Sequence, residues 1–460
     1  ARSGDRPQQG NGGQIMSDGQ SYFDWTAETF DPARVFDKPE ALRGVRVIEL
    51  CTLVLGPATA DYLAEFGAEV IKVELPPAGD TMRYVPPEGY FWRNLCFGFT
   101  PINHSKYHVG IDLHHDEGKE LFRHLVAKSD VVVENLRAGG MDAFDLGYRQ
   151  LREVNPRIIY LAANGFGQWG PFAVGRASYD LLAQAVSGLA SITGFPGRTP
   201  MKSGIYIGDF FGALMNAVSI LAALHYRKRT GQGQYIEYSQ GEGLIRSLDW
   251  TWIYQHLTGQ ERERSGNRDV AISPSDIFRC TDGFVAIAAG DDEAFRGLCM
   301  AMGQPELAQD SRFATLPSRL QPENNEALSE LIAEWAVDKT KAELDDLGAE
   351  HGFAAAPVMT AKDHYESEHL RTRRSVWNFA DSLYAEMTEY GPAPKLSETP
   401  GRVRWVARPV GFHNEYVFRK LLGLSTSQMR QLEEKGIVGQ WAERPGAMPL
   451  DGWQGEGLIM

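Results

Sequence analysis

Apolar runs of strand length alternate with helix-like stretches in the first half of the chain. Residues 45–51 and 68–74 are two such runs. Between them, Ala60, Leu63 and Phe66 recur at the spacing of one helix face. A strand, a helix and a second strand in this order predict a parallel strand pair joined by a right-handed crossover.

The same alternation continues as far as residue 239. The patterns predict helices over 117–128, 148–154, 179–192 and 210–228, and strands over 109–113, 130–134, 157–162 and 234–239. Strands and helices that alternate in this way are typical of an open α/β sheet. The pattern then changes to a strand over 284–288 and helices over 293–302, 325–335 and 427–435, which favours a second, smaller α+β domain over about 250–355.

Composition and charge narrow the classes of protein. The chain has 460 residues, enough for two or three domains, and its 46 basic and 60 acidic residues give a net charge of −14. No basic stripe is present, so a nucleic-acid partner is not expected. No apolar run approaches the roughly 18 residues of a membrane span, so no membrane association is expected. The four cysteines are scattered and form no CxxC pair, which fits a reducing cytoplasm.

Common ligand-binding motifs are missing. The turn after the first predicted strand, residues 52–57, lacks the GxGxxG pattern of dinucleotide-binding folds, and no Walker A sequence occurs. These absences argue against a nicotinamide enzyme and a P-loop NTPase. The eleven histidines, which include His104 and the pair His114-His115, do not follow the spacing of a zinc signature, so no metal site is predicted.

Two aspartates stand at predicted helix starts. Asp209 precedes the helix over 210–228, and Asp180 begins the helix over 179–192. An aspartate at such a position commonly caps the helix by accepting backbone N–H hydrogen bonds, and position alone favours that interpretation. The alternative is a reactive carboxylate, because a helix N-terminus keeps a carboxylate ionised at neutral pH.

Five segments in sequence order carry a family resemblance. They are LRGVRVIEL…GP…YLAEFGAEVIKVE from residue 42, DLHHDEGKELFRHLVAKSDVVVENLRAGGMD from 112, NPRIIYLAANGFGQWGPFA from 155, YDLLAQAVSGLASITG from 179 and GDFFGALMNAVSILAALHYRKRTGQGQYIEYS from 208. Together they closely resemble the class III CoA-transferase family, which includes formyl-CoA transferase and carnitine CoA-transferase. The resemblance runs from about Leu42 to the C-terminus and is strongest up to residue 245.

The resemblance implies a fold and a set of domains. The fold is a large Rossmann-like α/β domain split in sequence, with a small α+β domain inserted, and the dimer is interlocked like two links of a chain. We therefore expect an N-terminal extension over 1–41, the first part of the large domain over 42–245, the small domain over 246–355 and a C-terminal segment over 356–460 that returns to the large domain. The first 19 residues are expected to be disordered, and part of residues 1–15, ahead of Met16, is expected to be foreign to the protein.

The resemblance also makes Asp209 the catalytic nucleophile of a CoA-transferase. In that chemistry the carboxylate attacks an acyl-CoA donor, an aspartyl-CoA thioester forms, and a carboxylic acid acceptor takes up the CoA. The coenzyme A thioester is then a substrate, and no cofactor is expected to be bound permanently. The developing oxyanions need N–H donors; residues 165–168 and 265–267 are candidates, and ordinary turns explain these segments equally well.

The family's CoA site transfers to this chain only in part. The expected substrate- and CoA-binding positions are Val54, Leu55, Leu75, Lys106, His114, Asn135, Leu136, Arg137, Ala143, Tyr179 and Asp180. Leu75 and Ala143 stand where formyl-CoA transferase has arginines. His114 and Ala177 stand where it has lysines. Each lost phosphate contact is worth about 1.5–3 kcal/mol.

Two consequences of this loss are open. Arg83, Lys106 and Arg137 could replace the missing cations, in which case the chain works as a homodimer. Alternatively, the chain belongs to a heteromer in which a homologous subunit completes the CoA site, or it is a non-catalytic partner in such a heteromer. The retained Asp209 argues against a purely structural role.

Clusters of aromatic residues bear on the identity of the acceptor. Aromatic residues gather at 22–25, 90–92 and 250–254, where core packing is the favoured interpretation. The functional interpretation is a pocket for a bulky, aromatic acid such as an arylsuccinate, with succinyl-CoA as donor. A short polar diacid is equally compatible with the catalytic core.

A related chemistry is disfavoured by one residue. The α-methylacyl-CoA racemases of the same superfamily pair the aspartate with a histidine base. That histidine position holds Tyr179, and a tyrosine is a poor proton-abstracting base at neutral pH. The sequence therefore favours CoA transfer over racemisation.

Overall fold

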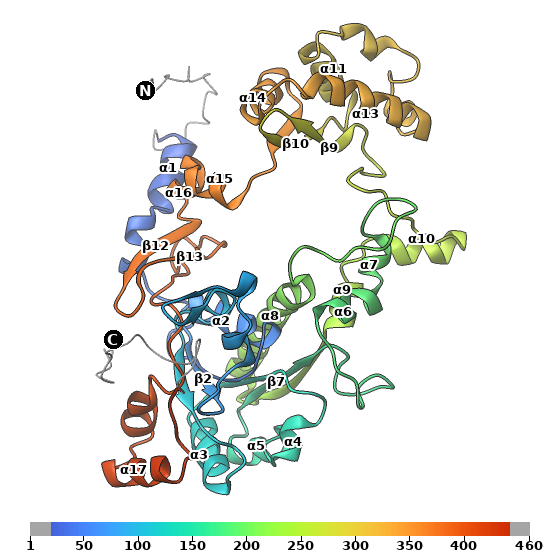
Figure 1. Ribbon diagram of the computed structural model, residues 1–460. Coiled ribbons are helices and arrows are strands. Elements are labelled where there is room, and N and C mark those ends of the chain that lie inside the picture. The colour runs from blue at the N-terminus through green and yellow to red at the C-terminus, as the bar shows by residue number, and fades with distance from the viewer. Residues whose placement is uncertain (1–19, 442–460) are drawn as a thin grey trace. The chain divides into compact units, whose positions relative to one another are not determined.

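The computed structural model describes residues 20–441, so the expectations for residues 1–15 and 1–19 lie outside the described residues. Contacts divide the chain into two compact units. Unit 1 takes in residues up to Ala183, Tyr206–Leu244 and residues from Glu368 on, and unit 2 comprises Gln184–Ile205 and Ile245–Ser367. Figure 1 labels elements of both units.

A six-stranded sheet forms the centre of unit 1. Its order is β5 (Tyr107–Gly110), β2 (Glu69–Glu74), β1 (Arg46–Leu50), β6 (Val131–Glu134), β7 (Ile159–Asn164) and β8 (Gln234–Ser239). Every neighbouring pair is parallel. Numbered along the chain within this sheet, the strands run 3-2-1-4-5-6, which is the order of doubly wound folds. The predicted open α/β sheet is confirmed.

Strand side chains alternate between two cores. Val47 packs with helices α2 (Leu55–Glu65) and α8 (Ile207–Thr230) on one face of the sheet. Its neighbour Ile48 packs with α3 (Asp116–Ala127) and α5 (Tyr148–Val154) on the other. Because successive strand residues point to opposite faces, an unbroken apolar strand fits a sheet covered on both sides.

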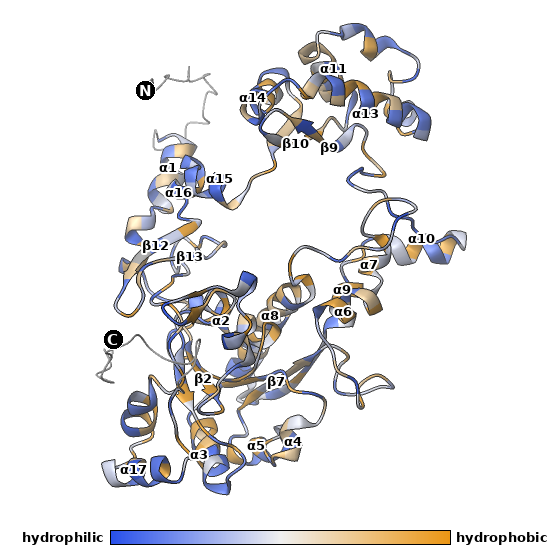
Figure 2. Cartoon of the chain, viewed as in Figure 1, coloured by the Kyte–Doolittle hydropathy of each residue, from blue (hydrophilic) through white to orange (hydrophobic). Residues whose placement is uncertain are grey.

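Helix α8 carries both buried and exposed apolar residues. It begins three residues before the predicted start and ends at Gly231, whose φ of 78° forms the C-cap. No apolar run of membrane-span length was expected, yet by length and composition alone α8 could cross a membrane. Its buried face, which includes Ala217 and Ile220, packs within unit 1 as a core helix does, whereas Leu214, Val218 and Leu221 are 52%, 62% and 43% exposed. The apolar residues along α8 can be followed in Figure 2.

The predicted helix over 179–192 is interrupted. It forms α6 (Asp180–Ser187) and α7 (Leu189–Ile192), separated by Gly188 at a φ of 88°. By its contacts, the segment Gln184–Ile205 belongs to unit 2, although the sequence suggested the large domain. Arg264 holds this segment by donating hydrogen bonds to the carbonyls of Ser191, Phe195 and Arg198.

Unit 2 has its own small α+β core. A three-stranded antiparallel sheet, β9 (Ser275–Cys280), β10 (Gly283–Ala288) and β11 (Ala354–Pro357), packs with α11 (Asp292–Ala301), α13 (Pro322–Ala336) and α14 (Lys341–His351). Phe295, Leu298 and Leu328 are among its fully buried side chains.

The N-terminal and C-terminal parts of unit 1 pack together. α1 (Tyr22–Thr29) and the 3-10 helix Pro32–Asp37 lie in the extension, and β12 (Val376–Asp381), β13 (Ala385–Tyr390) and α17 (Thr426–Glu434) lie in the C-terminal segment. The ring centroids of Phe36 and Trp377 lie 5.9 Å apart. The remaining short elements are Thr81–Tyr84, Pro87–Gly89, β3 (Phe91–Trp92), β4 (Leu95–Cys96), Thr100–Ile102, α4 (Gly140–Ala143), α9 (Gln240–Ile245), α10 (Thr251–Thr258), Pro305–Gln309, α12 (Leu316–Arg319), α15 (Ala361–Glu366), α16 (Glu368–Thr372) and Glu415–Leu421.

Candidate active site

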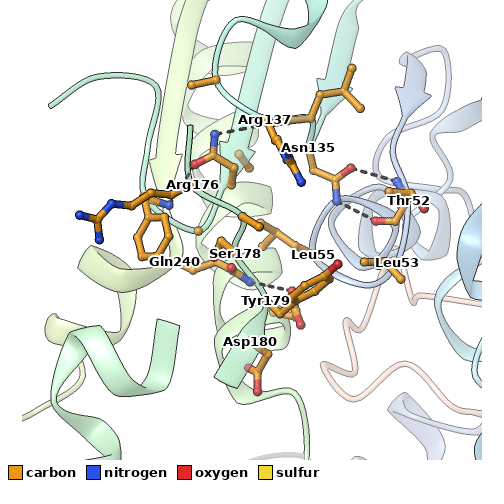
Figure 3. Close-up of a pocket in the computed structure, with 18 of the residues that line it drawn as sticks. Thr52, Leu53, Leu55, Asn135, Arg137, Arg176, Ser178, Tyr179, Asp180 and Gln240 are labelled. Carbon is orange, nitrogen blue, oxygen red and sulfur yellow. Dashed lines mark hydrogen bonds between the residues drawn. The ribbon is translucent and has the colours of Figure 1, made fainter. Parts of the chain in front are cut away.

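A pocket lies where β1, β6, β7 and β8 end. In open α/β sheets, ligands bind outside the carboxyl ends of the strands, where the strand order reverses, and here that point lies between β1 and β6. The pocket has a volume of about 270 Å³ and is lined by residues 52–55, 135–138, 163–166, 173, 176–180, 209 and 240. Figure 3 shows it with Asn135, Arg137, Arg176 and Gln240 labelled. All of these residues belong to unit 1.

Asp209 lies in the first turn of α8 but does not cap it. The helix begins at Ile207, and the N-cap residue is Tyr206, which makes no side-chain capping hydrogen bond. The capping interpretation of Asp209 is therefore wrong. Its Oδ1 instead accepts a hydrogen bond of 2.6 Å from Nε2 of Gln240, the first residue after β8.

The environment of Asp209 makes its carboxyl group more basic than usual. Burial is the main cause, the negative charge of Asp180 adds to it, and together they raise the pKa of Asp209 to about 7. Hydrogen bonds from Gln240 and from the backbone amide of Leu55 act in the opposite direction. Among the described residues, none forms an ion pair with Asp209. These two hydrogen bonds are therefore the interactions that stabilise its ionised form.

Asp180 fixes the start of α8 from a neighbouring helix. It is buried, and its Oδ1 accepts a hydrogen bond of 2.7 Å from the amide of Gly208. A Cβ atom at Gly208 would lie only 3.0 Å from this oxygen, so glycine permits the close approach. Asp180 therefore satisfies a free N–H group of α8 and stands beside Asp209.

The loop after β1 is held in a strained conformation at the pocket. Leu53 has a φ of 64°, which is rare for a residue with a side chain. Its amide donates to Asp80 Oδ1 at 2.9 Å, and the side chain of Asn135 bonds both the amide and the carbonyl of Thr52. Strain of this kind persists only where the surroundings enforce it, and it is common at ligand sites.

Four of the amides in the predicted oxyanion-donor segments already donate hydrogen bonds within the protein. The amides of Phe166 and Gly167 donate to Asn164 Oδ1, and the amide of Gln168 donates to Glu237. In unit 2, the amide of Gly266 donates to the carbonyl of Gly194. These four amides therefore have partners within the protein, in agreement with the alternative that both segments are structural turns.

Two arginines line the pocket. Arg137 was a predicted binding residue, whereas Arg176 was not. Arg176 is exposed, and its guanidinium lies 4.0 Å from the Phe172 ring centroid. The signal for Arg176 was present in the sequence, because it directly precedes Ala177, which stands in place of a family lysine.

Arg83 and Lys106 cannot replace the missing cations in this structure. Arg83 is buried and forms a two-pronged ion pair with Glu74. Lys106 is fully buried, lies 2.7 Å from a carboxylate oxygen of Glu49 and donates to backbone carbonyls. Breaking such a buried ion pair costs about 3–5 kcal/mol in comparable cases.

The other predicted binding positions separate into two groups. Val54, Leu55, Asn135, Leu136, Tyr179 and Asp180 line the pocket with Arg137 and Asp209. Leu75, Lys106, His114 and Ala143 are not part of its lining. Leu75 is 44% exposed, and the exposed His114 bonds Asp112.

One buried group in the described part of the chain has the spacing of metal ligands. Asp61, Glu65 and His104 bring their ligand atoms within 4.8 Å of one another. Nε2 of His104 lies 3.2 Å from Asp61 and 3.3 Å from Glu65. Burial lowers the pKa of His104, but the carboxylates outweigh burial and raise it to about 9, while burial raises the pKa of Asp61 to about 8. Sequence spacing did not indicate this group, because His104 lies in a loop that is distant in sequence from Asp61 and Glu65.

Comparisons with known proteins agree with the geometry. The family model described as CoA-transferase family III matches residues 42–414. The chain is 38% identical to the succinyl-CoA–D-citramalate CoA-transferase of Chloroflexus aurantiacus, over 87% of this chain and 98% of the relative. It is 33% identical to the succinyl-CoA–L-malate CoA-transferase beta subunit of the same organism, over 86% and 98%.

A solved structure agrees as well. The chain is similar to a CAIB/BAIF family protein from Brucella suis with a TM-score of 0.74 and 31% identity, over 83% of this chain and 99% of that protein. The family match covers both the sheet and the pocket at its carboxyl edge. The chain therefore belongs to CoA-transferase family III, and it is a CoA-transferase whose substrates are CoA thioesters.

Proposed function

We propose that this chain moves CoA from succinyl-CoA to a second short dicarboxylic acid through a thioester on Asp209. One observation carries the proposal. Asp209 lines the pocket at the carboxyl edge of the sheet, with one oxygen bonded to Gln240 and no cation paired with it among the described residues. A carboxylate neutralised by a lysine or arginine would be a weaker nucleophile.

The proposed reaction exchanges acyl groups without ATP. An Asp209 oxygen attacks the thioester carbonyl, the C–S bond breaks, and CoA leaves as a thiolate, which gives a mixed anhydride between Asp209 and the donor acid. The thiolate attacks the Asp209 carbonyl and releases the donor as a carboxylate, which leaves an aspartyl-CoA thioester. The acceptor carboxylate attacks this thioester, and the released thiolate then attacks the acceptor acyl carbonyl and frees Asp209.

The raised pKa of Asp209 suits this role. A carboxylate with a pKa of about 7 is more basic than an exposed one, yet a large fraction is ionised at neutral pH. Gln240 and the Leu55 amide can bond the non-attacking oxygen and take up charge that develops on it.

The dicarboxylate acceptor is supported by the relatives and by the pocket's cations. The two Chloroflexus relatives are named for succinyl-CoA with D-citramalate or L-malate. Arg137 and Arg176 offer guanidinium groups for CoA phosphates or for a second substrate carboxylate. The aromatic groups at 22–25, 90–92 and 250–254 are absent from the pocket lining, so they lend no support there to an arylsuccinate acceptor.

We further propose a homodimer that works in the cytoplasm without a homologous partner. Arg176 compensates in part for the lost basic positions, and the exposed apolar residues of α8 suit a subunit interface. The four free cysteines fit a reducing compartment. One relative is named as the beta subunit of a CoA-transferase, so the need for a homologous partner must be tested directly.

A substrate screen tests the proposal. The purified chain, expressed alone, is given succinyl-CoA with short diacids, hydroxy diacids or arylsuccinates, and new CoA esters are measured by chromatography. We expect transfer to a short diacid, its loss in Asp209→Asn, and its retention in the surface control Asp145→Asn. Activity that appears only with a co-expressed homologue would contradict the homodimer, and an active Asp209→Asn variant would contradict the covalent route.

A further inference from the structure

A second, smaller cavity lies in unit 1, away from the residues that line the catalytic pocket. It forms between the N-terminal extension, at residues 29–38, and the C-terminal segment, at residues 373–401, and has a volume of about 30 Å³. A cavity that holds one water needs roughly 10–15 Å³ by the same measure, so a group of a few heavy atoms can enter. Residues 29–38 precede the family match, which starts at residue 42.

Four basic side chains line this cavity: Lys38, Arg373, Arg374 and Lys395. Within the described residues, none of them forms an ion pair with a carboxylate, although the chain as a whole has a net charge of −14. The one acidic residue in the lining is Asp31, and its Oδ1 accepts a hydrogen bond from the amide of Ala33. The cavity wall therefore carries a local excess of positive charge.

The polar groups at the cavity retain donors for a ligand. Nζ of Lys38 donates to the carbonyls of Thr29 and Ser397, at 2.9 and 2.7 Å, and an ammonium group has a third hydrogen. The guanidinium of Arg374 lies 3.6 Å from the ring centroid of the buried Trp377, and its Nη1 donates to the carbonyl of Pro32 at 3.0 Å, so its other N–H groups are those that can bond a ligand.

The positive charges of the basic groups at this cavity also repel one another. Burial, followed by the charges of Arg373 and Arg374, lowers the pKa of Lys395, while Glu65 acts in the opposite direction. Burial also lowers the pKa of Arg374. Partly buried cations without a counter-ion are unfavourable, and an anion would relieve that cost.

We propose that this cavity binds a small oxyanion, a carboxylate or phosphate group, held by Lys38, Arg373, Arg374 and Lys395. A bound oxyanion can accept hydrogen bonds from both sides of the cavity. It thereby ties the N-terminal extension to the C-terminal segment, and this role is independent of the proposed CoA transfer.

Limited proteolysis gives a local readout of this site. Arg34 lies in the 3-10 helix Pro32–Asp37 next to the cavity, and trypsin can cleave after it when the extension opens. The full chain is digested in inorganic phosphate, in succinate, and in sodium chloride at equal ionic strength. We expect saturating phosphate or succinate to slow cleavage after Arg34 about 5-fold or more relative to chloride.

A double variant and a control make the test specific. Arg373→Gln/Lys395→Gln should lose the protection, with half-saturation moved up about 10-fold or more. Arg296→Gln/Lys362→Gln removes two surface charges outside the cavity and should keep the protection. If the double variant is unfolded by circular dichroism, the single variant Arg373→Gln is used in its place.

Each outcome either identifies the chemical class of the ligand or overturns the proposal. Protection by phosphate alone supports a phosphoryl ligand, and protection by succinate supports a carboxylate ligand. Equal protection by chloride, no protection, or equal protection in the double variant and the wild type would overturn the proposal.

Discussion

Gln240 and Asp209 are joined by a hydrogen bond of 2.6 Å that connects the end of β8 to the first turn of α8. Gln240 is buried, so its amide stays close to the carboxylate. The bond leaves one carboxylate oxygen free of Gln240, and it lowers the pKa of Asp209 against the larger effect of burial. Several consequences can be measured.

Replacement of Gln240 by leucine should slow transfer and move its pH dependence. Loss of the hydrogen bond removes an interaction with the ionised carboxylate, so the pKa of Asp209 should rise further. We expect kcat to fall about 10- to 100-fold, with a smaller change in the donor KM. The pH profile of kcat/KM should shift to higher pH; an unshifted profile would mean that Gln240 acts only on packing. Gln321→Leu, on the surface of unit 2, is the control.

The pH dependence of the wild type follows from the pKa of about 7 for Asp209. The nucleophile must be ionised, so kcat/KM should fall as the pH drops below about 7, with a slope of one proton. Initial rates from pH 5.5 to 8.5, with donor stability measured in parallel, check this. A profile that stays flat down to pH 5 would contradict the raised pKa.

Asp209→Asn should make the protein more stable at alkaline pH. The folded pKa, about 7, lies above the unfolded value of 3.8, so the stabilisation from this group is complete below pH 3.8 and is lost as the pH rises through 7. A shift of this size corresponds to about 4 kcal/mol as an upper limit, and partial exposure reduces it to about 1–3 kcal/mol. Urea unfolding at pH 8 and pH 5 should show the larger gain at pH 8; an equal gain at both would point to packing.

Arg137→Ala and Arg176→Ala should weaken binding of the CoA donor. Both side chains line the pocket, and each phosphate or carboxylate contact is worth about 1.5–3 kcal/mol. We expect the donor KM to rise about 10-fold for each variant, with kcat less affected. Arg149→Ala, which removes an 84% exposed side chain outside the pocket, should leave KM unchanged. Unchanged KM in both pocket variants would show that CoA is held elsewhere.

Val218→Glu should disturb the proposed dimer. Val218 is 62% exposed on α8, in line with the exposed Leu214 and Leu221. A buried unpaired carboxylate at a subunit interface costs several kcal/mol, so light scattering after size exclusion should detect monomer at micromolar concentration. Met300→Glu, on the equally exposed face of α11, is the control. A variant that stays dimeric would move the interface away from α8.

The repeating parts of the fold could be predicted because their signal is local. The central strands such as β1 and β2 are apolar runs because helices cover both faces of the sheet, so the length and order of these runs were enough to predict the strands. The break at Gly188 was missed because the apolar spacing continues through it, and only the left-handed backbone interrupts the helix.

The site could be predicted where residues that are neighbours in sequence determine the local structure. It could not be predicted where residues distant in sequence determine it. The start of α8 moved ahead of Asp209 because a distant residue, Asp180, satisfies the amide of Gly208. Arg83 and Lys106 looked available because their buried partners, Glu74 and Glu49, lie on strands whose neighbours the sequence does not specify.

The proposed CoA transfer depends most on a covalent bond between CoA and Asp209. The chain is incubated with succinyl-CoA without an acceptor, quenched in acid and digested with trypsin, and the peptide of residues 203–227 is analysed by mass spectrometry. We predict a CoA thioester at Asp209 that hydroxylamine converts to a hydroxamate and that Asp209→Asn does not form. An active wild-type enzyme with no adduct, or with CoA on another residue, would contradict the account.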